Sequence, residues 1–198
     1  MKESLIVISL ILMACCSCQS NIKDCGLYED VANWKDKIIQ LPSDSSIVGK
    51  GDISELNTPS TDYFIFRYIS PNGCTSCKLH LHLYAEILRE LSDSSGVEVG
   101  FLCVVHTKDV DNIKHVLKRD NSDNLSVWVD ETDTINKINQ FLEDERFQTF
   151  LLDKENRVLA IGDPAVNPRV MQLFVDVLRS DSIRARGRHH LREQVVAQ

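Results

Sequence analysis

The sequence lacks several features that would mark it for a large class of proteins. It has no excess of basic residues, since 22 Lys and Arg stand against 29 Asp and Glu, with a net charge of −7 and a pI near 5.3. This acidic balance argues against nucleic acid as a partner. There are no internal repeats, and 198 residues favour one domain over two. The apolar run at residues 5–13 is too short to span a bilayer.

That apolar run has the character of a secretory signal. It follows MKES, which carries a single lysine, and it stops at Ala14 and Cys15. The stretch LMAC resembles the lipobox of bacterial lipoproteins: an aliphatic residue, a small residue before the cut, then cysteine. The resemblance implies removal of residues 1–14 and acylation of Cys15, whose chains would anchor the protein to a membrane. The alternative is an ordinary signal peptide cut near Ser17 or Ser20.

If the protein is exported, its seven cysteines can form disulfides, because disulfides form and persist outside the cytoplasm. Residues 15–26 read as a polar tether that follows the signal peptide. The sequence does not decide whether the three tether cysteines after the anchor form disulfides: Cys16, Cys18 and Cys25. Cys103 lies in the run GFLCVV, which predicts a buried small hydrophobe. The remaining two, Cys74 and Cys77, stand two residues apart just past Pro71 and Gly73.

Hydrophobic periodicity predicts an alternating α/β order. A leading helix is expected over residues 27–41, stopped by Pro42, and residues 43–61 form a loop. The expected strands are 63–69, 97–105, 125–129, 150–152 and 158–161, the last two as a hairpin. The expected helices are 75–91, 109–118, a short helix or loop at 134–142, and a last helix that Pro168 opens. Residues 181–198 end in the basic stretch RARGRHHLR, for which a disordered tail is the default.

This order resembles the thioredoxin fold over residues 62–180. The CxxC pair lies between a strand and a helix, and TFLLDKENRVLAIG looks like the paired strands that close such domains. With the lipobox and the Trp34-bearing leading helix, the chain looks like the thioredoxin-like lipoproteins of Bacteroidota. The resemblance implies a three-layer sandwich, with a central mixed β-sheet flanked by helices. Alternation itself predicts that the early strands are parallel.

The cysteine pair predicts thiol-disulfide exchange. At a helix start, Cys74 would take the N-cap and Cys77 the third helical position, so that free N–H groups point at the Cys74 sulfur. Such surroundings lower a thiol pKa, which makes Cys74 the expected nucleophile and Cys77 the resolving thiol. The hydroxyls of Thr75 and Ser76, which lie between them, are candidates to donate to the thiolate.

Two positions depart from the thioredoxin pattern. The family's cis-proline beside the cysteine pair is replaced by Gln148, which precedes Thr149, and we expect both residues to support the site. Many thioredoxins carry a buried acid about six residues before the first cysteine, where this chain has Tyr68, beside Arg67. Either departure is compatible with altered specificity, slower exchange or lost activity.

Three functions therefore stay open. The first is a lipid-anchored oxidoreductase of the bacterial cell envelope, on the periplasmic face or the cell surface, acting on protein disulfides or small thiols without a cofactor. The second is a thioredoxin-like accessory module with a structural Cys74–Cys77 disulfide. The third is a copper or zinc carrier that adds His106 or His80 to the cysteines. For His80 and His82, surface histidines are the favoured interpretation, so no metal site is expected.

Overall fold

The computed structural model describes residues 29–41, 59–72, 74–119 and 125–196 of the chain. It forms two compact units, Met1–Trp34 and Lys35–Gln198. In the first unit, residues 29–32 form a helical turn and the Trp34 amide donates to the Val31 carbonyl at 3.1 Å. The Trp34 side chain is buried. The signal peptide, the tether and Cys15 all lie outside the described residues.

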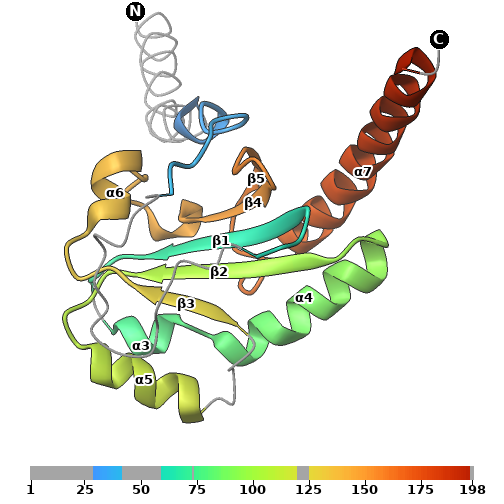
Figure 1. The fold of residues 1–198 in the computed structure, drawn as a ribbon. Coiled ribbons are helices and arrows are strands. Elements are labelled where there is room, and N and C mark those ends of the chain that lie inside the picture. The colour runs from blue at the N-terminus through green and yellow to red at the C-terminus, as the bar shows by residue number, and fades with distance from the viewer. Residues whose placement is uncertain (1–28, 42–58, 73, 120–124, 197–198) are drawn as a thin grey trace, which may run out of the picture. The chain divides into compact units, whose positions relative to one another are not determined.

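The second unit is built on a mixed five-stranded sheet in the order β3-β2-β1-β4-β5 (Figure 1). Its strands are β1 (Tyr63–Ile69), β2 (Val99–Val105), β3 (Ser126–Val129), β4 (Thr149–Asp153) and β5 (Val158–Ile161). β1 pairs in parallel with β2, and β2 with β3, whereas β4 is antiparallel to β1 and β5 to β4. The expected strands, the parallel β1–β2 pair and the closing hairpin are confirmed.

The helices lie on both faces of this sheet, as expected for a three-layer sandwich (Figure 1). They are α3 (Thr75–Lys78), α4 (Leu81–Ser95), α5 (Val110–Arg119), α6 (Thr134–Asn139) and α7 (Pro168–Val196). The elements α3, α4 and α5 lie on one side and α6 on the other, while α7 packs against α4 and β5. The helix α7 continues through the basic stretch for which we expected a disordered tail.

Alternate residues of each strand divide the core into two layers, because successive side chains of a strand point to opposite faces. On the face of α4, α5 and α7, Ile65, Phe101 and Val127 belong to one large buried cluster with residues of those helices. On the opposite face the core is aromatic: the ring of Phe141 lies 5.8 Å from that of Phe66 and 5.5 Å from that of Phe150. Burial on both faces explains why the strands read as continuous apolar runs.

The leading segment is extended where we expected a helix. Asp36 has a left-handed backbone, with φ 65°, and Ile38 forms an antiparallel bridge with Arg157 at the edge of β5. The amide of Asp36 donates to the Val158 carbonyl at 2.9 Å, and the Val158 amide donates to Lys37 at 2.8 Å. Pairing with the open edge of β5 satisfies backbone groups that a helix would have left exposed there. The helix expected over residues 27–41 is therefore wrong beyond residue 32.

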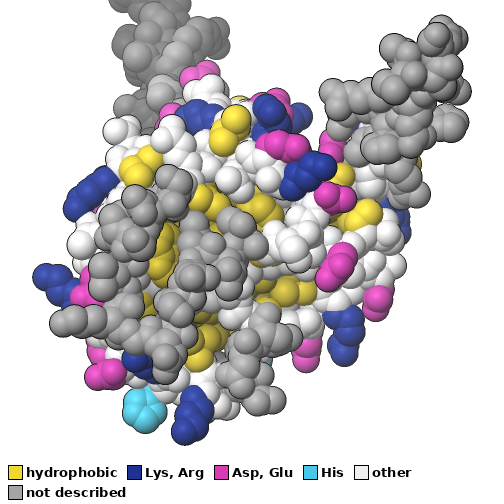
Figure 2. Space-filling view, in the orientation of Figure 1, with side chains coloured by type: hydrophobic (Ala, Val, Ile, Leu, Met, Phe, Trp, Pro, Cys, Tyr) yellow, Lys and Arg dark blue, Asp and Glu magenta, His cyan; other side chains and the backbone are white. Residues whose placement is uncertain are grey.

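The surface seen in Figure 2 carries acidic and basic side chains interspersed, without one large region of a single sign. Within the described residues, no helix combines the length and the apolar character needed to cross a bilayer. Neither observation bears on residues 1–28, which contain the expected signal and anchor.

The docking of the leading segment on β5 predicts unequal losses of stability for two neighbouring isoleucines. Ile39 is fully buried, whereas Ile38 is 55% exposed. We expect Ile39→Ala to lower the free energy of unfolding by about 2–5 kcal/mol through lost burial and a residual cavity. The control Ile38→Ala is expected to change it by less than about 1 kcal/mol. Urea unfolding measures both, and equal losses would contradict the extended docking.

Candidate functional site

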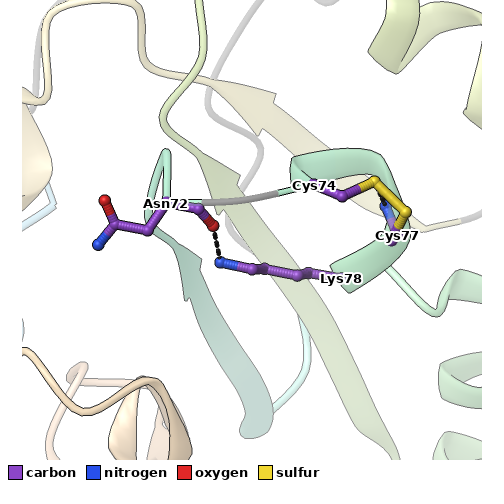
Figure 3. Close-up of a disulfide and its surroundings, with 4 residues drawn as sticks. All are labelled: Asn72, Cys74, Cys77 and Lys78. Carbon is purple, nitrogen blue, oxygen red and sulfur yellow. Dashed lines mark hydrogen bonds between the residues drawn. A yellow bond between two sulfur atoms is a disulfide. The ribbon is translucent and has the colours of Figure 1, made fainter.

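The cysteine pair lies at the surface, on the one-turn helix α3 that follows β1. Cys74 is the N-cap, with φ −81° and ψ 96°, and its Sγ accepts a hydrogen bond from the Cys77 amide at 3.2 Å. Cys77 occupies the third helical position, and the two sulfurs are joined as a disulfide with Cα atoms 5.3 Å apart (Figure 3). Both cysteines are exposed. These are the helical positions that the sequence predicted for the pair.

The helix that carries the pair is shorter than expected. One helix was expected over residues 75–91, but α3 ends at Lys78 and α4 starts at Leu81. Between them His80 has a left-handed backbone with φ 47° and ψ 33°. Leu79 and Leu81 are both fully buried, and residues two apart cannot share one face of a continuous helix. The break lets both leucines enter the core.

The break changes the electrostatic argument for Cys74. A long helix would have placed an extended macrodipole behind the sulfur, but α3 has only four residues. The effect of a helix end comes mainly from the free N–H groups of its first turn. In this turn the Cys77 amide makes that contact directly. The local N–H donor is thus the feature that favours a thiolate at Cys74.

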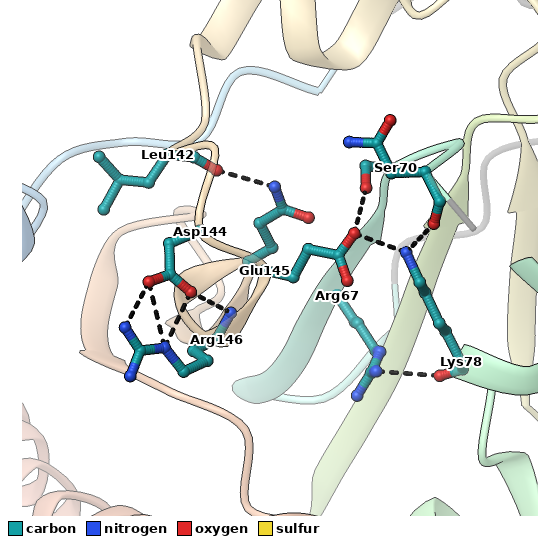
Figure 4. A network of polar contacts seen from close by, with 9 residues as sticks. Arg67, Ser70, Lys78, Leu142, Asp144, Glu145 and Arg146 are labelled. Atoms are coloured by element: carbon teal, nitrogen blue, oxygen red, sulfur yellow. Dashed lines mark hydrogen bonds and ion pairs between the residues drawn. The ribbon is translucent and has the colours of Figure 1, made fainter. Parts of the chain in front are cut away.

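Lys78 fastens the loop that precedes the pair. Its ammonium group donates to the Asn72 carbonyl and to Glu145 Oε1, the latter at 2.5 Å (Figures 3 and 4). The same carboxylate oxygen accepts from the Ser70 hydroxyl at 2.9 Å. Glu145 belongs to the 3₁₀ turn η2 (Glu145–Phe147), which leads into β4. The contacts therefore tie both ends of the loop after β1 to the turn before β4.

The electrostatics of this contact depend on pH. The hydrogen bond from Lys78 holds the pKa of the Glu145 carboxyl below its usual value, against the opposing effect of burial. A carboxyl whose pKa is lowered in the folded state stabilises that state above its unfolded pKa. The contribution is lost as the pH falls through the lowered value. Because the Glu145 side chain is 43% exposed, solvent screening keeps this contribution small.

Arg67 lies on β1, on the face toward α4, beneath the end of α3. Its Nη2 donates to the Lys78 carbonyl at 2.9 Å, and its Nη1 donates to Asp163 Oδ2 at 2.5 Å and to the Tyr84 hydroxyl. The Tyr84 hydroxyl donates to Asp163 Oδ1 at 2.7 Å. Burial alone would lower the pKa of the guanidinium, but the oxygens of Tyr84 and Asp163 raise it overall. Arg67 therefore stays cationic in the core.

By its position in the sequence, Tyr68 stands where many thioredoxins carry a buried acid. The structure places the Tyr68 side chain on the opposite face of the sheet, where its hydroxyl donates to Asp133 Oδ1 at 2.6 Å and its ring stacks on Phe141. Burial and the Asp133 contact raise the pKa of this phenol. The charged residue that faces the cysteine turn is Arg67, one position earlier. The sequence carried a signal for this role: Arg67 is the one charged residue of the apolar strand YFIFRYI, at a position whose side chain points to the α4 face.

Gln148 and Thr149 are buried next to the site. The Gln148 side-chain Nε2 donates to the Leu142 carbonyl at 2.7 Å, and the Gln148 backbone carbonyl accepts from the Tyr68 backbone amide at 2.9 Å. The described residues contain no cis peptide bond, so the Phe147–Gln148 bond is trans, as expected. Gln148 and Thr149 line a cavity of about 20 Å³ that Lys78 also lines. Lys78, the residue after Cys77, therefore lies across this cavity from Gln148 and Thr149. The supporting role of Gln148 and Thr149 stays a prediction.

The other candidate groups divide between structural contacts and burial. Thr75 and Ser76 form the first turn of α3 through their backbone, and the proposed role of their hydroxyls stays a prediction. His106 Nδ1 donates to the Asp130 carbonyl at 2.7 Å. Cys103 is fully buried, and burial raises the pKa of its thiol to about 12. Among the residues that the structure describes, no three His, Cys, Asp or Glu side chains are arranged to hold a metal ion.

Comparison with known proteins gives distant structural relatives. No protein-family model and no curated protein matches the chain. Solved structures that match include a domain of a possible thiol-disulfide isomerase from Cytophaga hutchinsonii, with 14% identity, a TM-score of 0.47, and coverage of 66% of this chain and 83% of that one. Another is the thioredoxin domain of a thiol-disulfide oxidoreductase from Bacteroides vulgatus, with 14% identity, a TM-score of 0.42, and coverage of 58% and 80%.

A third match is a thioredoxin-like protein from Bacteroides caccae, with 16% identity and a TM-score of 0.40. The match covers 58% of this chain but 40% of that protein, so this chain spans less than half of its length. Likenesses this weak do not carry an argument about activity. The fold is instead fixed by strand order and register, and the chemistry has to be argued from the cysteine turn.

Proposed function

We propose that the protein is a thiol-disulfide oxidoreductase that acts outside the cytoplasm. The observation that carries the proposal is the exposed Cys74–Cys77 pair, with the Cys74 sulfur at an N-cap where it accepts the Cys77 amide. A reactive cysteine needs access to its partner and a donor that stabilises its thiolate, and Cys74 has both. A resolving thiol must lie within bonding distance, which the observed disulfide satisfies.

The proposed reaction is an exchange of two electrons without a cofactor. The Cys74 thiolate attacks one sulfur of a substrate disulfide, so that a mixed disulfide forms and one substrate thiolate leaves. Cys77 loses its proton and attacks the Cys74 sulfur, which releases the second substrate thiolate and forms the Cys74–Cys77 disulfide. The substrate disulfide is reduced by two electrons and the cysteine pair is oxidised by two. The same steps run in reverse when a dithiol reduces the pair.

Exposure distinguishes the proposed reactive pair, Cys74 and Cys77, from the buried Cys103. Cys103 is buried with a raised thiol pKa, so it does not compete for the substrate. Lys78 directs its ammonium toward the Asn72 carbonyl, away from the sulfurs (Figure 3), and pairs it with Glu145. Both cysteines are exposed. Exposed sulfurs suit partners that present a disulfide at their own surface, and small thiols reach the same sulfurs.

The proposal includes the location of the enzyme. The signal-like N-terminus and the LMAC stretch support a lipoprotein that is anchored through Cys15 in the bacterial cell envelope. We expect Cys15→Ser to release the protein from the membrane fraction or to leave its precursor uncut. Mass spectrometry of the mature N-terminus is the direct measurement. An unmodified first residue downstream of Cys15 would contradict anchoring and would leave the exchange chemistry untouched.

Trapping of partners tests the exchange itself. Cys77→Ser should accumulate mixed disulfides through Cys74 in membranes, because attack proceeds while resolution fails. They are read on non-reducing gels and mapped by mass spectrometry to the Cys74 peptide. Cys74→Ser is the matched control and should trap nothing through residue 77. Cys103→Ser should trap as the wild type does, because Cys103 is buried.

The result that overturns the proposal is equally specific. If Cys77→Ser captures no partner and small disulfides such as oxidised glutathione also fail to form an adduct at Cys74, the pair does not exchange. The Cys74–Cys77 disulfide would then act as a staple of the turn. The chain would be a thioredoxin-like accessory module rather than an enzyme.

A further inference from the structure

The break between α3 and α4 frees a backbone carbonyl directly after the cysteine pair. In a continuous helix the Lys78 carbonyl would accept from the amide four residues on. Here His80 is left-handed, and the first carbonyl of the new ladder is that of His80, which accepts from Leu83 at 2.9 Å. The Lys78 carbonyl accepts instead from Arg67 Nη2 at 2.9 Å. A side chain from the sheet thus replaces a helical donor.

The replacement brings a full positive charge under the turn. Arg67 is 9% exposed, Asp163 is 7% exposed and Tyr84 is fully buried. Charges this deep in a protein are retained only when they are paired and hydrogen-bonded. Asp163 Oδ2 and the Tyr84 hydroxyl supply those partners to Arg67 Nη1. Arg67 Nε is buried and makes no hydrogen bond in the described part of the chain.

The ion pair has a direction. Its positive end, Arg67, contacts the residue next to Cys77. Its negative end, Asp163, lies past β5, where its carboxylate accepts the Ala165 amide at 2.8 Å ahead of α7. Cys103, which is opposite Arg67 in the β1–β2 register, carries a neutral thiol and does not cancel the cation. In a poorly solvated core such a dipole is weakly screened, so it acts on charges that form in the turn.

We propose that Arg67 is a positioning residue of the cysteine turn, which donates to the Lys78 carbonyl and sets the positive end of a buried ion pair against the end of the helix that carries the Cys74–Cys77 disulfide. The consequence for exchange rests on the proposed function. The cation favours the reduced pair, because reduction creates thiolate charge that it attracts. Arg67 thereby shifts the equilibrium of the Cys74–Cys77 pair toward the reduced dithiol.

Substitutions at the two ends of the ion pair should shift the Cys74 thiol pKa and the redox equilibrium in opposite directions. Asp163→Asn keeps the shape and leaves Arg67 uncompensated, so it should lower the Cys74 thiol pKa and shift the glutathione equilibrium toward the reduced pair. Arg67→Gln should shift both quantities the opposite way. We expect changes of about three- to tenfold in the equilibrium constant, where tenfold corresponds to about 30 mV for two electrons.

Two controls separate charge from packing. Tyr84→Phe removes a hydroxyl but no charge, and should shift the equilibrium by less than about twofold. Arg67→Lys keeps the charge but loses the fork that reaches both Lys78 and Asp163, and should retain most of the wild-type equilibrium constant. Far-ultraviolet circular dichroism checks that each variant is folded. If Arg67→Gln does not fold, the test is the shift of Asp163→Asn toward the reduced pair, with Arg67→Lys close to the wild type.

The outcomes distinguish this inference from the proposed function. The thiol pKa is measured on the reduced protein by thiolate absorbance near 240 nm, with or without exchange activity. Opposite shifts for Asp163→Asn and Arg67→Gln support the inference even if no partner is ever trapped. Shifts in the same direction, or no shift in Asp163→Asn, overturn it even if wild-type protein exchanges disulfides rapidly.

Discussion

The guanidinium of Arg67 connects β1 to three other parts of the domain, one of which is the helix that carries the cysteine pair. It extends from β1, caps the end of α3 at Lys78, and pairs with Asp163 after β5 and with Tyr84 of α4. A buried cation is costly unless its partners are held in place, so this one constrains the elements that supply them. Arg67 contacts the end of α3 at the break before α4, and it contacts Asp163 in the segment that leads into α7.

Polar contacts hold the segments on both sides of the cysteine pair, whereas the two sulfur-bearing side chains face solvent. Lys78 and Glu145 join the loop after β1 to the turn before β4, and Arg67 holds the far end of α3. The Cys74 and Cys77 side chains remain exposed. In the proposed function, this arrangement would let a partner contact the sulfurs without disturbing the packed core.

Much of the fold was predictable because periodicity and propensity agreed along the strands, and the N-cap positions of the cysteines followed from their place between a strand and a helix. The helix break was missed, although Leu79 and Leu81 could not both be buried in one helix. The leading segment was misread because Ile38 fits a helical stripe, whereas burial of Ile39 beside β5 decides its conformation. The role of Arg67 needed residues distant in sequence, which no local pattern brings together.

The proposed exchange requires that the Cys74–Cys77 disulfide be reversible under the conditions outside the cytoplasm. A redox titration of the wild-type protein, with the pair quantified by alkylation and mass spectrometry, tests this directly. Structural disulfides of secreted proteins have reduction potentials below about −300 mV, and labile or catalytic ones lie higher. We expect a single two-electron transition of the Cys74–Cys77 pair above that value. A pair that stays oxidised until the potential falls below about −300 mV would contradict it and would identify the disulfide as a staple.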